Sequence, residues 1–403
     1  TEENTLSLHD ALPISVTALW DDGSHSTAGG RVLVPHFGIH TWPSSSDCPF
    51  PGANETNWQR HREAGFDTPF LWKTTYASYE GCNGASARDI LAAAEAVPDQ
   101  WLMVAREIDI TGFRTDRLLW FTGDEPDSGV GNAPWEKARY SRRAWRSTPE
   151  MATYVGGSRH RHNGSFAGVT DIQGFDIYIS ACAPYILDFG HFPPLRAPFD
   201  FARAVRNNQS PWPTWIYSHG MLGKTDPVRE PSPSEIWIQA LSPVAAGAKG
   251  LMYFQTSLKG ADRRPESWRA IAEANRMVRA VRDELVLGDP TGGARADREG
   301  VVVEAIRTPS SLVIPVINVT AREEMNDLRC LFEEDPHWVL EDVATTIRVA
   351  LPPDLPVGSV REHRDGAWQD PEGIPYRLGD DLVIPSVRLS ERRPVRLFRV
   401  SGP

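Results

Sequence analysis

Short apolar runs alternate with helix-like segments from residue 32 to about residue 285, and this pattern predicts the fold of most of the chain. Continuous apolar runs are typical of parallel strands that are buried on both faces. The expected strands cover residues 32–39, 68–74, 101–107, 118–125, 151–155, 172–179, 213–218 and 250–255. Eight such strands in about 250 residues predict an α/β fold of the (β/α)8 TIM barrel type, in which the third connection is too short for a full helix.

The pattern changes at Gly288–Gly300, a segment rich in Gly and turn residues that we interpret as a linker. Beyond it, short apolar runs separated by turns predict a C-terminal antiparallel β-sandwich. The expected domains are a barrel over residues 30–287 and a β-sandwich over residues 300–403. Thr5–Ile14 resembles a translated sequencing adapter, so we interpret residues 1–14 as non-native and expect the native N-terminus, with any signal peptide, to be missing.

The composition argues against two classes of partner. The net charge is −11, from 42 Lys and Arg against 53 Asp and Glu, whereas nucleic-acid binding requires a basic surface. No stretch of the sequence approaches the roughly 20 apolar residues of a membrane span. The 14 Trp residues are a high number, and aromatic rings line sugar-binding clefts as well as protein cores.

The four cysteines and the histidines form no metal-binding pattern. Cys48 and Cys82 both lie in loop-like sequence, where they either form a disulfide or remain buried thiols. His36, His40 and His219 lack the spacing of metal ligands. We therefore expect neither a metal nor another cofactor.

Polar and aromatic residues recur near the C-terminal ends of the expected strands, where barrel enzymes place their active sites. Structural needs alone would not favour so many polar groups at one end of a barrel. The tyrosines and tryptophans among them could instead belong to the core. We expect the following residues to bind a substrate at the mouth of the barrel: His36, Trp72, Lys73, Tyr178, Trp215, Tyr217, His219 and Gln255.

Residues 118–126, LLWFTGDEP, form the most informative motif. An apolar run ends at Gly123 and is followed by Asp124 and Glu125, and Pro126 favours extended backbone at the residue before it. Neighbouring carboxylates repel each other's charge, so one stays protonated to higher pH, as a general acid must. Because side chains alternate along a strand, both acids face one pocket only if the chain bends near Gly123. The alternative is that the two acids cap the following loop or pair with arginines.

Paired acids in an aromatic cleft suit glycosidic-bond cleavage, which needs a protonated carboxyl group beside the leaving oxygen and a second group at the anomeric carbon. With the barrel order, Gly123–Pro126 resembles glycoside hydrolases that act by substrate assistance on 2-acetamido sugars. Family 123, which contains bacterial β-N-acetylgalactosaminidases, is the most similar in motif, and family 20 hexosaminidases share the arrangement. The resemblance implies a carbohydrate substrate, with Glu125 as general acid/base. It also implies that Asp124 orients the acetamido group whose carbonyl oxygen attacks the anomeric carbon.

The expected seventh strand ends in TWIYSHG, without the carboxylate that two-glutamate barrel glycosidases carry there, and this favours substrate assistance. Asp176, in GFDIY, is the candidate second carboxylate of an alternative mechanism. In an inverting glycosidase it would be the base, about 6.5–9.5 Å from Glu125, and it could also serve a lyase-like reaction or simply bond to backbone amides. A third alternative is a non-catalytic carbohydrate-binding protein on a barrel scaffold. The substrate class alone indicates a secreted or periplasmic location.

Overall fold

A computed structural model of the protein describes most of its residues. They comprise residues 13–19, 25–31, 36–44, 47–77, 81–114, 116–124, 133–147, 152–157, 169–175, 177–180, 194–208, 215–221, 230–334 and 336–402.

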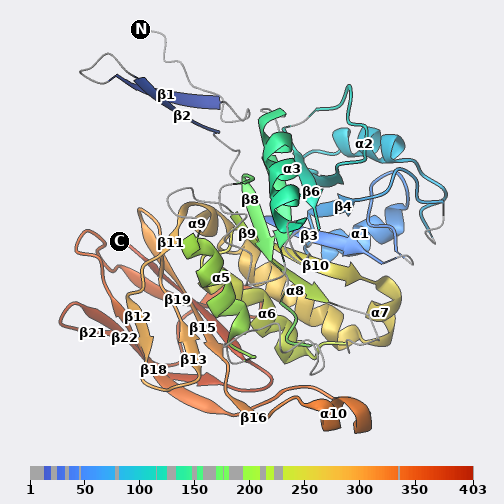
Figure 1. Cartoon of the computed structure of the whole chain (residues 1–403). Coiled ribbons are helices and arrows are strands. Elements are labelled where there is room, and N and C mark those ends of the chain that lie inside the picture. Colours follow the sequence, from blue (N-terminus) through green and yellow to red (C-terminus); the bar gives the residue numbers. More distant parts are fainter. Residues whose placement is uncertain are drawn as a thin grey trace.

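Eight parallel strands form the centre of the larger part of the molecule (Figure 1). Each strand pairs with the next along the chain, and the last strand, β10, pairs with the first, β3, as well as with β9. Their bounds are β3 (Gly38–Pro43), β4 (Thr68–Leu71), β5 (Leu102–Ala105), β6 (Leu118–Gly123), β7 (Ala152–Gly157), β8 (Ile172–Phe175), β9 (Trp215–Met221) and β10 (Gly250–Thr256). All residues of β4, β5 and β8 are buried, as expected for parallel strands covered on both faces. The predicted α/β class is thus confirmed as a mixed α/β, TIM-barrel-like domain.

The helices lie between these strands, in the alternation that the sequence predicts. Their bounds are α1 (Glu55–Glu63), α2 (Ala87–Glu95), α3 (Ala133–Ser147), α5 (Ala197–Asn208), α6 (Pro233–Ala245), α7 (Leu258–Arg263), α8 (Pro265–Arg279) and α9 (Arg282–Leu287). Ser86 and Ser232 begin α2 and α6 with reciprocal capping boxes, in which the serine and the acid three residues later bond each other's backbone. Residues 106–114 and 116–117, which connect β5 to β6, contain no helix, as the short third connection predicts.

The first barrel strand begins later than the sequence predicts. The expected strand covers residues 32–39, whereas β3 starts at Gly38 and includes Trp42. The position of β3 is set by its pairing with β10, in which Gly250 lies opposite Gly38 and Phe254 lies opposite Trp42. Apolar side chains alone cannot specify this register, because a strand that is buried on both faces looks similar in every frame.

Two short antiparallel strands, β1 (Pro13–Leu19) and β2 (His25–Arg31), precede the barrel and pair only with each other among the described strands. Figure 1 shows this hairpin standing away from the parallel sheet. Residues 1–12, which include most of the adapter-like segment Thr5–Ile14, lie outside the described residues.

Antiparallel sheets form the C-terminal part of the molecule. A seven-stranded sheet contains β11 (Asp289–Pro290), β13 (Val301–Val303), β14 (Ile306–Arg307), β15 (Ser311–Asn318), β19 (Ser359–Arg364), β20 (Ala367–Gln369) and β23 (Val395–Ser401). A four-stranded sheet contains β12 (Ala294–Ala296), β18 (Val343–Ala350), β21 (Tyr376–Leu378) and β22 (Asp381–Leu389). Side chains from both sheets share one apolar cluster, which includes Ile314 of β15 and Ile384 of β22. A small pair, β16 (Ala321–Glu323) and β17 (Val339–Leu340), and the helix α10 (Asp327–Phe332) complete this part.

The segment that we interpreted as a linker is part of these sheets. It contains β11 and β12, which pair with β14 and β18. The composition of Gly288–Gly300 indicates turns, but partners far along the chain supply the backbone hydrogen bonds that make two of its pieces into strands.

A continuous apolar cluster connects the two parts of the molecule. It includes Leu241 of α6 and Ile317 of β15, and Figure 1 shows the C-terminal sheets beside α6 and α9. Trp338 adds polar contacts, because its backbone N–H donates to Glu235 Oε1 at 2.9 Å and its indole N–H donates to the Ile179 carbonyl oxygen at 2.8 Å. The C-terminal part therefore supports the segment that follows β8. No helix in the described part of the chain is long and apolar enough to cross a bilayer.

Candidate active site

A cavity of about 610 Å³ lies at the C-terminal ends of β3, β4, β5 and β6. The ends of these four strands and one face of α3 form its walls. The lining residues are Trp42, Phe70, Trp72, Ala105, Arg106, Glu107, Phe121, Thr122, Gly123, Asp124, Glu136, Lys137, Tyr140 and Ser141. A concave site with aromatic walls and a few polar groups is the usual form of a small-molecule site, and this is the end at which barrel enzymes carry their chemistry.

Aromatic rings form one side of the cavity. The Trp42 ring lies 5.9 Å from the Trp72 ring and meets the Phe70 ring edge-on at 4.7 Å, measured between centroids. The ring of Phe121, on β6, lies 6.0 Å from the Trp42 ring. Each ring is therefore held by another ring, which gives the cavity a rigid apolar wall of the kind that packs against the C–H face of a sugar.

Charged groups line the cavity directly after β5. Arg106 Nε lies 2.6 Å from Glu107 Oε1, and the Arg106 guanidinium carbon lies 5.2 Å from the centre of the Tyr140 ring. The hydrogen bond to Glu107 is the main cause that raises the pKa of Arg106 above its ordinary value. Arg106 thus stays charged and is oriented by two neighbours, one of which belongs to α3.

Asp124 is the acid of the DEP motif that the structure describes, and it is exposed at the rim of this cavity. The pairing of β6 with β7 shifts register between Phe121 and Gly123, and the chain bends at Asp124. Such an irregularity redirects side chains next to active sites. The Thr122 hydroxyl donates to Ser141 Oγ at 3.1 Å and ties this strand end to α3. The chain therefore bends next to Gly123, and that both acids face this cavity stays a prediction.

The predicted site residues differ in where the structure places them. Asp124 and Trp72 line the cavity. Glu125 and Asp176 lie outside the described residues, and for Trp215, Tyr217, His219 and Gln255 the structure describes the backbone only. Lys73 and Tyr178 do not line the cavity: Lys73 Nζ lies 4.5 Å from the Trp72 ring centre, and the Tyr178 ring lies 6.4 Å from that of Phe254 at the end of β10.

The expectation that His36 lies at the mouth is wrong. Because β3 begins at Gly38, His36 precedes the strand and lies at the opposite end of the sheet. Its ring stacks on Trp101 with centroids 4.1 Å apart, and its Nε2 lies 3.2 Å from the hydroxyl of Thr68, the first residue of β4. Arg282 Nη2 donates to His36 Nδ1 at 2.8 Å. Burial, and secondarily the charge of Arg282, holds the pKa of His36 well below its ordinary value, so the ring is neutral and structural.

The seventh strand also differs from its prediction. It was expected to end at Ser218, whereas β9 runs from Trp215 to Met221. Trp215 is thus the first residue of the strand, at the end away from the mouth, and Tyr217 and His219 lie within it. The reason is again register: pairing with β8 and β10 extends β9 beyond its most apolar residues. Gln255 keeps its predicted place, one residue before the end of β10.

The sequence reasoning missed the contribution of α3. Glu136 and Tyr140 are four residues apart, as are Lys137 and Ser141, so all four lie on neighbouring positions of one helical face. One sequence signal could have assigned α3 to the site. The sequence predicts a helix directly after the DEP motif, and this helix contains an aromatic residue among its charged residues. Within the described ranges, no group of three or more His, Cys, Asp or Glu side chains is arranged to hold a metal ion.

No protein-family model matches the sequence, and no curated protein matches it. Solved structures do resemble it in fold. A glycoside hydrolase family 5 protein from Bacteroides vulgatus has a TM-score of 0.55 at 11% identity, over 96% of this chain and 93% of the other. Alpha-L-fucosidase isoenzyme 2 from Paenibacillus thiaminolyticus has a TM-score of 0.56 at 8% identity, over 91% and 100%. Eubacterium rectale Amy13B has a TM-score of 0.51 at 6% identity, over 92% and 97%. At these identities the comparisons show the fold: the chain has a fold that glycoside hydrolases also have.

Proposed function

We propose that this protein is a glycoside hydrolase whose active site is the cavity at the ends of β3 to β6. The observation that carries the proposal is the position of Asp124, which follows a register shift in β6 and lies in a cavity walled by Trp42 and Trp72. An exposed carboxylate in a cavity with a rigid aromatic wall suits a sugar held by its apolar face while its polar edge is attacked. The similarity of fold to glycoside hydrolases supports the same class.

For the mechanism we propose substrate-assisted retaining catalysis on a 2-acetamido sugar, as in family 123. Glu125 protonates the leaving glycosidic oxygen while the substrate's acetamido carbonyl oxygen attacks the anomeric carbon and forms an oxazolinium intermediate. Asp124 orients the acetamido group and stabilises its developing positive charge. The Glu125 carboxylate then takes a proton from water, which attacks the anomeric carbon and opens the oxazolinium ring, so that the anomeric configuration is retained. The sequence of β9, WIYSHGM, contains no carboxylate, and this supports a mechanism without a protein nucleophile.

The test compares aryl β-glycosides with and without a 2-acetamido group, using the wild type, Glu125→Gln and Asp124→Asn. We expect hydrolysis of the acetamido substrate and a loss of about 100-fold or more in each variant. Asp99→Asn is the matched control, because Asp99 is an exposed acid outside the cavity with φ of 58°, a conformation that asparagine tolerates.

Three results would redirect the proposal. Equal rates on acetamido and plain sugars would contradict substrate assistance and favour a two-carboxylate glycosidase that uses Glu125 and Asp176. Hydrolysis that survives both substitutions would remove the catalytic assignment. Sugar binding without turnover on any substrate would favour a non-catalytic carbohydrate-binding protein.

We further propose a complete (β/α)8 barrel over residues 30–287, a β-sandwich over residues 300–403, and a secreted or periplasmic location. The Cys48–Cys82 disulfide supports this location, because such bonds persist in oxidising compartments. A crystal structure with an open parallel sheet would contradict the barrel. Free-thiol titration of protein isolated from its native source checks the location, and reduced Cys48 and Cys82 would contradict it.

A further inference from the structure

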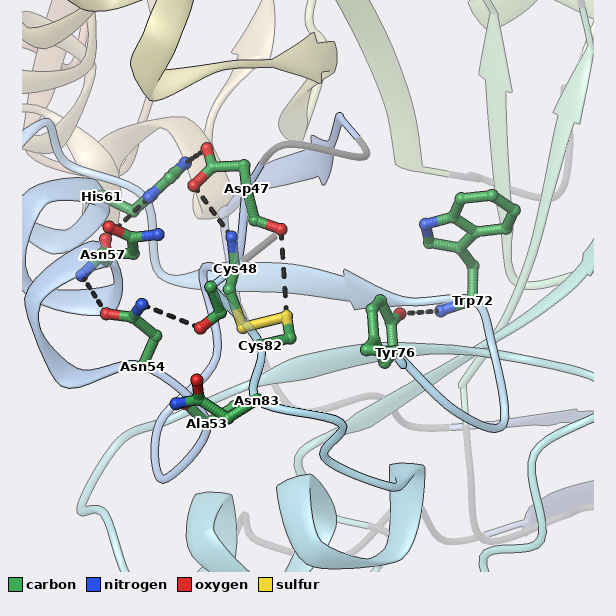
Figure 2. Close-up of a disulfide and its surroundings, with 11 residues drawn as sticks. Asp47, Cys48, Ala53, Asn54, Asn57, His61, Trp72, Tyr76, Cys82 and Asn83 are labelled. Carbon is green, nitrogen blue, oxygen red and sulfur yellow. Dashed lines mark hydrogen bonds and ion pairs between the residues drawn. A yellow bond between two sulfur atoms is a disulfide. The ribbon is translucent and has the colours of Figure 1, made fainter. Parts of the chain in front are cut away.

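Two loops beside the aromatic wall of the cavity are joined covalently. Cys48 lies between β3 and α1, Cys82 lies between β4 and α2, and the disulfide brings their Cα atoms to 5.2 Å (Figure 2). Both cysteines are completely buried, so the predicted alternative of a disulfide is the one that the structure confirms. A cross-link between residues 34 positions apart restricts how far the two loops can separate.

Hydrogen bonds between the same loops reinforce the disulfide. Asn54 Nδ2 donates to the Gly81 carbonyl oxygen at 2.8 Å, and Asn83 Nδ2 donates to the Ala53 carbonyl oxygen at 3.1 Å. Figure 2 shows these side chains clustered around the sulfur atoms. The two loops therefore form one unit with several connections.

This unit is anchored to helix α1. Asp47 Oδ2 lies 3.0 Å from His61 Nε2, and both side chains are buried. Asp47 Oδ1 also accepts the backbone N–H of Cys48 at 2.9 Å, while His61 Nδ1 lies 2.9 Å from the Asn57 carbonyl oxygen one turn earlier in α1. The residue next to the disulfide is thus fixed to a barrel helix (Figure 2).

Tyr76 connects the unit to the cavity wall. Its ring meets the Phe50 ring at 5.0 Å, two residues from Cys48, and both rings are fully buried. Its hydroxyl oxygen accepts the backbone N–H of Trp72 at 3.0 Å (Figure 2). Trp72 lies one residue beyond the end of β4, so its backbone N–H is outside the strand. The Tyr76 hydroxyl supplies the acceptor for that N–H.

We propose that Tyr76 and the Cys48–Cys82 disulfide are positioning groups that hold Trp72 in the cavity wall, so that its indole presents a fixed face to a sugar ring. The sugar as ligand rests on the proposed function, whereas the positioning is a property of the free protein. A ring that is already in place loses less conformational freedom when a ligand binds, so the effect belongs in substrate affinity.

The experiment uses Tyr76→Phe, the double variant Cys48→Ser/Cys82→Ser, and Tyr376→Phe as a matched control on the exposed strand β21. Tyr76→Phe keeps the ring beside Phe50 and removes the hydroxyl that accepts the Trp72 N–H. Hydrogen exchange resolved to the Trp72 amide measures positioning without any substrate. KM and kcat on an aryl glycoside that the wild type hydrolyses measure its consequence.

We expect Tyr76→Phe to speed exchange at the Trp72 amide by about fivefold or more, the effect of losing one hydrogen bond. KM should rise several-fold and kcat should change less than about twofold. In the double variant the amides of residues 47–54 and 81–86 should also exchange faster, and KM should rise further. Tyr376→Phe should match the wild type in every measurement.

Unchanged exchange at the Trp72 amide in both variants would overturn the inference. Faster exchange with unchanged KM, in a protein that hydrolyses glycosides, would overturn it while leaving the proposed function intact. If the wild type hydrolyses no glycoside, the proposed function fails, and the exchange measurement still decides whether Tyr76 and the disulfide position Trp72. If the double variant does not fold, the exchange and KM measurements on Tyr76→Phe alone test the inference.

Discussion

The two ends of the parallel sheet both carry polar groups, but they use them differently. At the N-terminal ends, His36, Thr68, Asp67 and Arg282 bond to one another in a largely buried group. At the C-terminal ends, Arg106, Glu107 and Asp124 are exposed on the surface of a cavity with aromatic walls. Buried polar groups that satisfy each other stabilise the fold, whereas polar groups exposed in a cavity can also contact a ligand, even where they pair with one another as Arg106 and Glu107 do.

The buried group forms a chain of donors. Arg282 Nη2 donates to His36 Nδ1, the neutral ring offers its other N–H to the Thr68 hydroxyl, and that hydroxyl donates to Asp67 Oδ1 at 2.8 Å. Arg282 Nη2 also lies 3.1 Å from Asp67 Oδ2, which closes the chain on itself. Removing one member takes a hydrogen-bond partner from its neighbours in a largely buried place, which costs more than the bond itself contributes.

The largest expected effect is at the mouth. Asp124→Asn should lower kcat by about 100-fold or more, because it removes the charge that is proposed to stabilise the transition state. The thermal midpoint should not change, because Asp124 is exposed. Steady-state kinetics with a melting curve checks both points. An unchanged kcat would show that the reaction does not depend on Asp124, and would contradict the functional difference between the two ends of the sheet.

The next effect is at the opposite end. His36→Phe keeps a ring on Trp101 but removes both hydrogen bonds, so the free energy of unfolding should fall by about 2–3 kcal/mol. Urea denaturation measures this loss. KM and kcat, measured well below the melting temperature, should stay at the wild-type values. A changed KM with unchanged stability would show that His36 acts on the substrate after all.

The pH dependence of stability isolates the same residue. The pKa of His36 is lowered in the folded state, so the unfolded state binds more protons as the pH falls below about 6.5. Folding stability should therefore decrease on acidification, by at most about 1.4 kcal/mol per pH unit for this one proton. His36→Phe should lose this part of the slope. Buried His363, whose pKa is also lowered by burial, remains in both proteins, so the difference between their curves reports on His36. Identical slopes would contradict the burial of a neutral ring.

The smallest expected effect concerns the α3 wall of the cavity. Tyr140→Ala removes the ring under Arg106, a contact worth about 1 kcal/mol, so KM should rise roughly fivefold with little change in kcat. Arg106→Lys, which keeps the charge and loses the planar group, should give part of this increase. An unchanged KM in both variants would show that the substrate-binding site consists of the strand ends and does not include the α3 wall.

Much of the fold could be predicted because the pattern of apolar runs is set by burial, which a sequence displays directly. The order of strands and helices, the short connection after β5 and the acid that follows β6 at Asp124 all belong to this group. The strand bounds could not be predicted, since pairing with distant strands sets them. A shift of six residues in the start of β3 moved His36 from the expected mouth to the opposite end.

The candidate site was predicted in part for the same reason. Trp72 and Asp124 lie near the C-terminal ends of the expected strands 68–74 and 118–125, and both line the cavity. Tyr140 and Arg106 could not be assigned, because their contact depends on how α3 packs beside β6 and β7. Cys48 and Cys82 indicated a disulfide as one alternative, but their link to Trp72 through Tyr76 required the positions of both loops.

By itself, the sequence determined the alternation of strands and helices, the change to β structure near residue 300 and the acid that follows β6 at Asp124, because local burial and turn chemistry specify each of these. Only the tertiary structure decided which polar groups satisfy each other and which face a cavity. That distinction depends on contacts between residues far apart in the chain, such as Arg282 with His36 and Tyr140 with Arg106, and no local pattern contains them.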